Sequence, residues 1–144
     1  MTVSNNDSTN ADNIFLRHGV KNITHISDEK MIRKGHHIHG NETFLDPDGR
    51  EFEILYITNN HATNAVAYCI SNPWGSNCKN RRSADTDYYK THIDKDGFLC
   101  LADDSCKDVF ESPYNLEFAI LRARFWAVAF SYYMENGCFP GVEE

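Results

Sequence analysis

Cysteine is the residue type in this sequence that offers the most direct route to covalent chemistry, because its thiolate is a strong nucleophile. The number of cysteines is odd, no Cys-x-x-Cys pair occurs, and no secretory hydrophobic segment opens the sequence. These features predict a cytoplasmic protein with reduced thiols, so that a free thiol is a candidate nucleophile. The chain contains five cysteines: Cys69, Cys78, Cys100, Cys106 and Cys138.

Cys100 is set apart from the other cysteines by the residues before it. His92 lies eight residues upstream, and the Asp96-Gly97 turn signal predicts a short extended segment that carries Cys100 beside a surface loop. Acyl transfer through a thiol needs an accessible thiolate and a donor for the oxyanion. A neutral His92 imidazole can donate one N–H to that oxyanion, and it can bias Cys100 towards the thiolate. The alternative is a small core residue at Cys100 and a polar surface group at His92.

Two further cysteines allow simpler interpretations. Cys106 stands six residues after Cys100 in an acidic stretch, as an exposed bystander, a second acyl acceptor or a disulfide partner of Cys100. The bystander interpretation is favoured, because an acidic run of this kind is usually a solvated loop. Cys69 lies in the apolar run Ala-Val-Ala-Tyr-Cys-Ile, and it is therefore expected in the core.

Three histidines close together, His36, His37 and His39, raise the question of a metal site. No cysteine or carboxylate recurs near them at ligand spacing, and successive residues of a strand point to alternating faces. The sequence also lacks a glycine-rich loop of the kind that cradles phosphate groups. We therefore expect neither a bound metal ion nor another cofactor.

The composition is that of one ordinary globular domain, since 41% of the 144 residues are hydrophobic and 24% are charged. The 14 Lys and Arg residues stand against 21 Asp and Glu, and the resulting net charge of −7 argues against nucleic acid as a partner. Residues 1–13 are polar and predict a disordered tail, which leaves residues 14–144 as a single domain. Arg122 and Arg124 interrupt the longest apolar stretch, so no membrane span is expected.

The first two thirds of the chain predict a β-rich region. Residues 37–45 and 51–58 flank the turn sequence Asp46-Pro47-Asp48-Gly49, which predicts a hairpin. Residues 65–71 predict a third strand, and residues 28–34 predict a short helix.

A long helix is predicted over residues 113–135, with Ser112 as its cap, Pro113 in its first turn and Gly137 at its end. This helix is apolar nearly all round, so most of it is expected to be buried. Trp74 and Trp126 are expected in the core. Strands followed by a long helix predict an α+β domain.

The segment around Cys100 resembles the ubiquitin-conjugating enzymes, which share the UBC fold. In that family a His-Pro-Asn motif is followed, eight residues after its Asn, by the catalytic cysteine, in the pattern Ile-Asp-x-x-Gly-x-Ile-Cys-Leu. Here the text reads Ile-Asp-Lys-Asp-Gly-Phe-Leu-Cys-Leu, which ends at Leu101, and Lys90-Thr91-His92 stands in place of His-Pro-Asn. Histidine at that place is familiar in bacterial relatives. Residues 123–141 resemble the last helix of the bacterial forms that occur in CBASS anti-phage operons.

The resemblance implies a UBC-like fold, with an antiparallel meander sheet, a catalytic-cysteine loop and a long C-terminal helix. It implies a stand-alone protein in which Cys100 forms a thioester with the C-terminus of a protein partner, a cGAS-like nucleotidyltransferase, while a separate enzyme activates that C-terminus. His92 would take the place of the family's Asn. Two alternatives remain open: a catalytically inactive binding module of the same fold, and a thiol- or metal-binding protein unrelated to conjugation.

Overall fold

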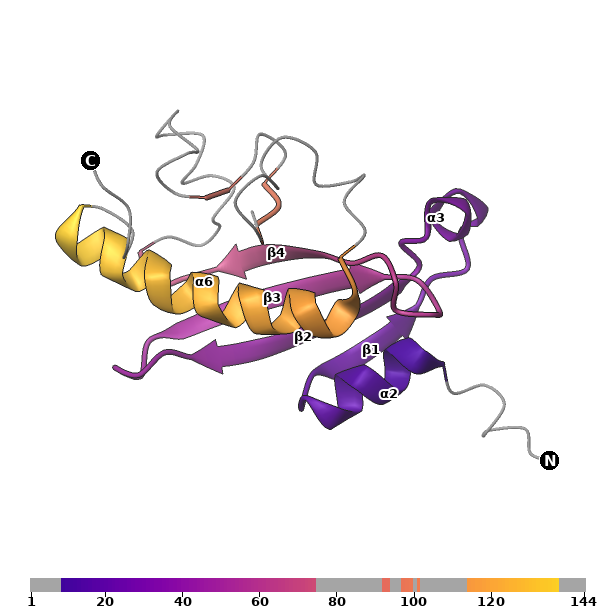
Figure 1. Cartoon of the computed structure of the whole chain (residues 1–144), viewed down its shortest axis with the longest axis horizontal. Coiled ribbons are helices and arrows are strands. Elements are labelled where there is room, and N and C mark those ends of the chain that lie inside the picture. The colour runs from indigo at the N-terminus through magenta and orange to yellow at the C-terminus, as the bar shows by residue number, and fades with distance from the viewer. Residues whose placement is uncertain (1–8, 75–91, 94–96, 100, 102–113, 138–144) are drawn as a thin grey trace.

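The computed structural model describes residues 9–74, 92–93, 97–99, 101 and 114–137. The four strands form one antiparallel sheet in the order β1-β2-β3-β4, and helix α6 packs across β3 and β4 (Figure 1). The α+β class and the antiparallel meander are therefore confirmed. The elements in chain order are α2 (Asn10–Arg17), β1 (Lys21–His25), α3 (Glu29–Lys34), β2 (Ile38–Leu45), β3 (Glu51–Thr58), β4 (Val66–Ser71) and α6 (Leu116–Asn136).

The predicted hairpin is confirmed as β2 and β3, which pair in continuous register from Ile38 opposite Thr58 to Leu45 opposite Glu51. Two features close its turn: Gly49 has a φ of 82°, a conformation that favours glycine, and Asp46 organises the backbone. The predicted third strand is β4, and the predicted short helix is α3, which Asp28 caps.

Asp46 also joins the hairpin turn to α6. Its Oδ1 accepts backbone hydrogen bonds from Asp48 and Arg50 at 2.9 and 2.8 Å, and its Oδ2 accepts one from Ser131 Oγ at 2.7 Å. Burial by itself would raise the pKa of Asp46. The hydrogen bonds from Ser131, Arg50 and Asp48, together with the charge of Arg50, outweigh burial and lower that pKa.

We expect Ser131→Ala to lower the free energy of unfolding by about 1–2 kcal/mol at pH 7, because the Asp46 carboxylate loses a buried donor. The folded-state pKa of Asp46 is depressed, so its contribution is present above the unfolded-state pKa of about 4 and is lost as the pH falls through the folded value. Denaturant titrations at neutral and strongly acidic pH should therefore show a difference that shrinks in acid. A difference constant with pH, or one shared by the exposed control Ser27→Ala, would contradict this account.

The predicted long helix is α6, and its end at Gly137, with a φ of 87°, is confirmed. Its start differs from the prediction: Asn115 caps the helix by accepting a hydrogen bond from the Phe118 N–H at 2.7 Å. Ser112 is therefore not the cap, and it lies outside the described residues together with Pro113. In the described part of the chain, no helix has both the length and the apolar character needed to cross a bilayer.

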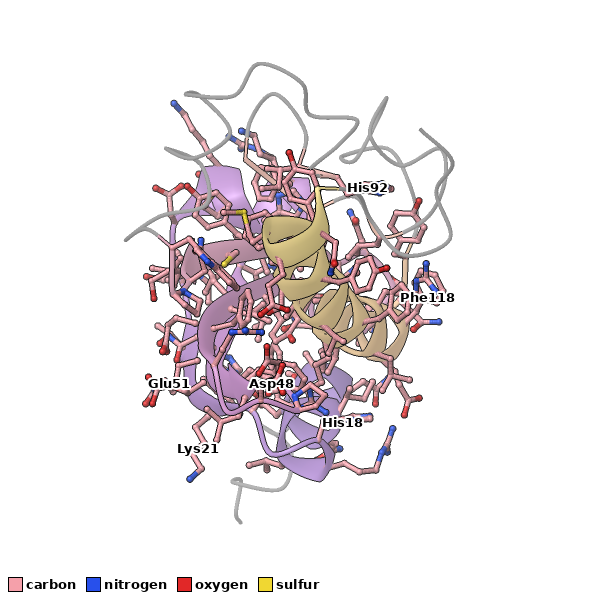
Figure 2. The ribbon with its side chains drawn as sticks, turned by 90° about the vertical axis from the view of Figure 1, so that its left-hand side faces the viewer. His18, Lys21, Asp48, Glu51, His92 and Phe118 are labelled. Atoms are coloured by element: carbon pink, nitrogen blue, oxygen red, sulfur yellow. The ribbon has the colours of Figure 1, made fainter. Side chains whose placement is uncertain are left out.

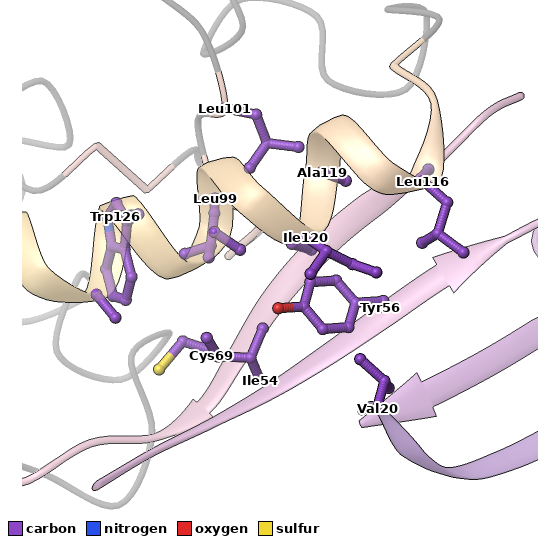
Figure 3. Close-up of a cluster of buried hydrophobic side chains, with 14 of the residues drawn as sticks. Val20, Ile54, Tyr56, Cys69, Leu99, Leu101, Leu116, Ala119, Ile120 and Trp126 are labelled. Atoms are coloured by element: carbon purple, nitrogen blue, oxygen red, sulfur yellow. The ribbon is translucent and has the colours of Figure 1, made fainter. Parts of the chain in front are cut away.

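The inner face of α6 forms the core with the sheet (Figure 3). The ring of Phe52 meets Trp126 and Phe130 edge to face, with centroids 6.0 and 6.5 Å apart. Trp126 is buried and Trp74 packs against the same cluster, so both tryptophans occupy the predicted place. The buried residues of this helix face include Leu116, Ile120, Ala123, Ala127 and Phe130.

The prediction that α6 is buried nearly all round is wrong. A helix that packs on one face of one sheet can bury only the side that faces that sheet, and its other side remains accessible. Five large apolar side chains on the outer side are 36% to 55% exposed: Phe118, Leu121, Phe125, Val128 and Tyr132.

The predicted tail also needs correction, because α2 begins within it. Thr9 and Asp12 form a capping box: the Thr9 N–H donates to Asp12 Oδ2 at 3.1 Å, and the Asp12 N–H donates to Thr9 Oγ1 at 3.0 Å. Ala11 and Phe15 of this helix are fully buried in the core. Residues 9–13 are thus part of the folded domain, whereas residues 1–8 lie outside the described residues.

Candidate functional site

The segment that contains the candidate site lies against β4, at the edge of the sheet that β3 leaves unpaired. The Leu99 N–H donates to the Ala67 carbonyl at 2.9 Å, and Phe98 forms an antiparallel bridge with Tyr68. The rings of Phe98 and Tyr68 also meet edge to face, 5.6 Å between centroids. A short piece of chain is thereby added to the sheet directly before Cys100.

The predicted turn is confirmed at its glycine. Gly97 has a φ of 96°, which a residue with a side chain rarely adopts, and Ile93 forms an antiparallel bridge with Leu99. Ile93 and Leu99 are both fully buried. The chain that leaves His92 therefore folds back, so that the residue before Cys100 lies opposite the residue after His92.

His92 begins this turn with a backbone strained for a non-glycine residue, since its φ is 58°. Asn, Asp and His are the non-glycine residues most often found in this left-handed region. Histidine and the asparagine of the family motif are thus both compatible with the position. The side chain of His92 is partly exposed, and it lies at the side of the molecule away from His18 and Lys21 (Figure 2).

Cys100 itself lies outside the described residues, as do Cys78, Cys106 and Cys138. Its two covalent neighbours are described: Leu99 and Leu101 are 0% and 1% exposed. Both lie beside α6 in Figure 3. The Leu101 carbonyl accepts a hydrogen bond from Arg122 Nε at 2.8 Å. The backbone is therefore anchored on both sides of the cysteine, by β4 before it and by α6 after it.

Arg122 is a positioning residue that the sequence did not identify. Besides its bond to the Leu101 carbonyl, its guanidinium lies over the rings of Phe118 and Phe125, 6.0 and 5.1 Å from their centroids. These rings hold the side chain in place through cation–π contacts. In the sequence Arg122 was recognisable only as an interruption of an apolar stretch, because its acceptor lies 21 residues away.

We expect Arg122→Met to loosen this segment without unfolding the domain. The exchange of the Leu99 amide hydrogen should accelerate at least about tenfold, because the segment opens locally at lower cost. The free energy of unfolding should change by less than about 1.5 kcal/mol, the range for one hydrogen bond. Hydrogen exchange followed by NMR measures both, with Arg33→Met on the exposed side of α3 as the control. Unchanged protection of Leu99 would contradict the positioning role.

The other candidate residues occupy structural positions. Cys69 is fully buried, as predicted, and its thiol donates to the Ser71 carbonyl at 3.2 Å. Burial lowers the pKa of His36, and the nearby charges of Lys34, His39 and His37 lower it further. Among the described residues, no group of three or more His, Cys, Asp or Glu side chains is arranged to hold a metal ion.

No protein-family model, curated protein or solved structure matches this chain. Its function is therefore inferred from its own residues and from the geometry of the segment around Cys100.

Proposed function

We propose that this chain is a ubiquitin-conjugating-like protein, which forms a thioester through Cys100 with the C-terminus of a protein partner. The anchored turn between His92 and Leu101 carries this proposal. A nucleophile must be held in a defined place, and here β4 and α6 hold its two neighbours. The order of antiparallel meander, cysteine segment and long C-terminal helix is also the order that the UBC resemblance implies.

The proposed step exchanges one thioester for another. The Cys100 thiolate attacks the carbonyl carbon of a C-terminus that a separate activating enzyme presents as a thioester. A new C–S bond forms, the carbonyl oxygen becomes an oxyanion, and an N–H of the neutral His92 imidazole donates to that oxyanion. The tetrahedral intermediate then collapses, the bond to the activating enzyme's sulfur breaks, and that sulfur leaves with the electron pair. No electron acceptor and no cofactor enter the balance.

The partner that the resemblance favours is a cGAS-like nucleotidyltransferase of a CBASS antiviral system, in the bacterial cytoplasm. Covalent capture of its C-terminus, or transfer of that C-terminus to an acceptor, would tune the synthesis of the second messenger. The chain's negative charge is consistent with a protein rather than a nucleic acid as the partner.

Co-expression with the nucleotidyltransferase encoded beside this protein tests the proposal on non-reducing gels. We expect an adduct with the unmodified chain and with the matched control Cys106→Ala, and none with Cys100→Ala. If Cys100→Ala keeps both the complex and the protection against phage, the protein is a non-covalent binding module and the proposal fails.

A further inference from the structure

The outer face of α6 presents a continuous row of large apolar side chains. Phe125 at its centre is 55% exposed and Leu121 is 52% exposed. Of the elements that the structure describes, the sheet covers only the opposite side of this helix (Figure 1). Monomeric soluble proteins seldom expose an apolar patch of this extent, and such patches commonly mark protein interfaces. We call Phe118, Leu121, Phe125, Val128 and Tyr132 the α6 seam.

The spacing of the seam indicates a helix as its partner. Successive members are three, four, three and four residues apart. This is the a and d spacing of a coiled coil, in which each side chain inserts between side chains of a facing helix. Phe118, Phe125 and Tyr132 take the a positions, and Leu121 and Val128 take the d positions.

The charges beside the seam indicate which helix. Glu117 takes a g position and Arg122 takes the e position five residues later, the pair that meets between parallel coiled-coil helices. A second copy would therefore bring Glu117 of each chain opposite Arg122 of the other. The remaining g residues, Arg124 and Ser131, would face uncharged e residues, so no like charges oppose one another.

Both members of this pair keep donor or acceptor atoms for an external contact. Glu117 uses Oε2 for His18 and Arg17, at 2.8 and 3.5 Å, and its side chain is 46% exposed. Arg122 uses Nε for the Leu101 carbonyl. Within the described part of the chain, Glu117 Oε1 and the two Nη groups of Arg122 make no hydrogen bond.

We propose that two copies of this chain associate through their α6 seams, with the two helices parallel. The inference does not depend on the proposed function, because it rests on the seam and its flanking charges. It does bear on the candidate site, since Phe118 and Phe125 of the seam hold Arg122, and Arg122 holds the backbone beside Cys100.

Analytical ultracentrifugation of the full chain tests the seam. We expect a dimer to predominate at about 100 µM, and Phe125→Glu to raise its dissociation constant at least about 30-fold, as for a central anchor. Leu45→Glu is the matched control, because Leu45 on β2 is also 55% exposed, and it should leave the dimer intact. A monomer at every concentration, or a dimer that Phe125→Glu does not weaken, would overturn the proposal.

A charge exchange tests the parallel arrangement. Glu117→Arg and Arg122→Glu should each weaken the dimer, because each chain then places like charges opposite its own copy. An equimolar mixture of the two variants should associate more tightly than either variant alone, because both contacts between unlike chains are again attractive. The loss of intramolecular contacts is common to the separate and mixed samples, so it cannot produce this gain. A mixture no tighter than its components would overturn the parallel arrangement.

Discussion

Arg124→Met should lower the free energy of unfolding by about 3–5 kcal/mol, the usual cost of removing one partner from a buried ion pair. Arg124 Nε and Nη2 donate to the two carboxylate oxygens of Glu42 at 3.0 and 2.8 Å, and Nη2 also donates to the His18 carbonyl at 2.7 Å. The side chain of Glu42 is only 8% exposed. The substitution would leave that carboxylate buried with the Tyr56 hydroxyl as its one remaining donor among the described residues.

The double variant Arg124→Met with Glu42→Gln should recover more than half of this loss, because a neutral amide still accepts from Tyr56 and leaves no buried charge. Arg17→Met is the control, since the side chain of Arg17 is 60% exposed and its pair with Glu117 is a surface contact. Its effect should stay below about 1 kcal/mol. Urea titrations measure all three variants. A loss below about 1 kcal/mol for Arg124→Met would show that this network does not hold α6 to the sheet.

His92→Gly should slow acyl transfer to Cys100 by about 10²–10³-fold, the usual effect of losing an oxyanion donor. The same substitution should leave the free energy of unfolding unchanged or raise it by about 1 kcal/mol, because glycine adopts the φ of 58° without strain. Slower chemistry in an equally stable protein separates the proposed role in catalysis from a structural role. Mass spectrometry of acyl uptake from a synthetic peptide thioester gives the rate.

His92→Asn is the conservative counterpart. Its amide can donate a hydrogen bond and its backbone tolerates the left-handed region, so the rate should stay within about tenfold of that of the unmodified chain. If His92→Gly reacts as fast as the unmodified chain, His92 is not the oxyanion donor.

Local signals in the sequence were sufficient for the elements whose residues suit only one structure. The Asp46-Pro47-Asp48-Gly49 turn and its alternating flanks specified the hairpin, and Gly97 specified the turn before Cys100. By contrast, β1 has a mostly exposed, polar strand pattern with no periodicity to reveal it. The helix α2 could have been found from its Thr9-x-x-Asp12 capping box, which the polar composition around it obscured.

Other features depend on contacts between distant parts of the chain. An apolar helix surface does not indicate which of its sides will meet a sheet, so the exposed seam of α6 was not predictable. The pairing of Arg124 with Glu42 spans 82 residues, and the bond from Arg122 to the Leu101 carbonyl involves a backbone atom with no sequence signature. These contacts, rather than the motif alone, determine how the cysteine segment is held.

The linkage formed by Cys100 is the most direct test of the proposed function. Intact-mass spectrometry of the purified adduct should give the summed masses of the two proteins less one water, and a thiol reagent should release it. Cys100→Ser should give an ester of the same kind that resists thiols and is cleaved by alkali. A mass lower by two hydrogens, which indicates a disulfide, or the absence of an adduct from both forms, would contradict thioester formation.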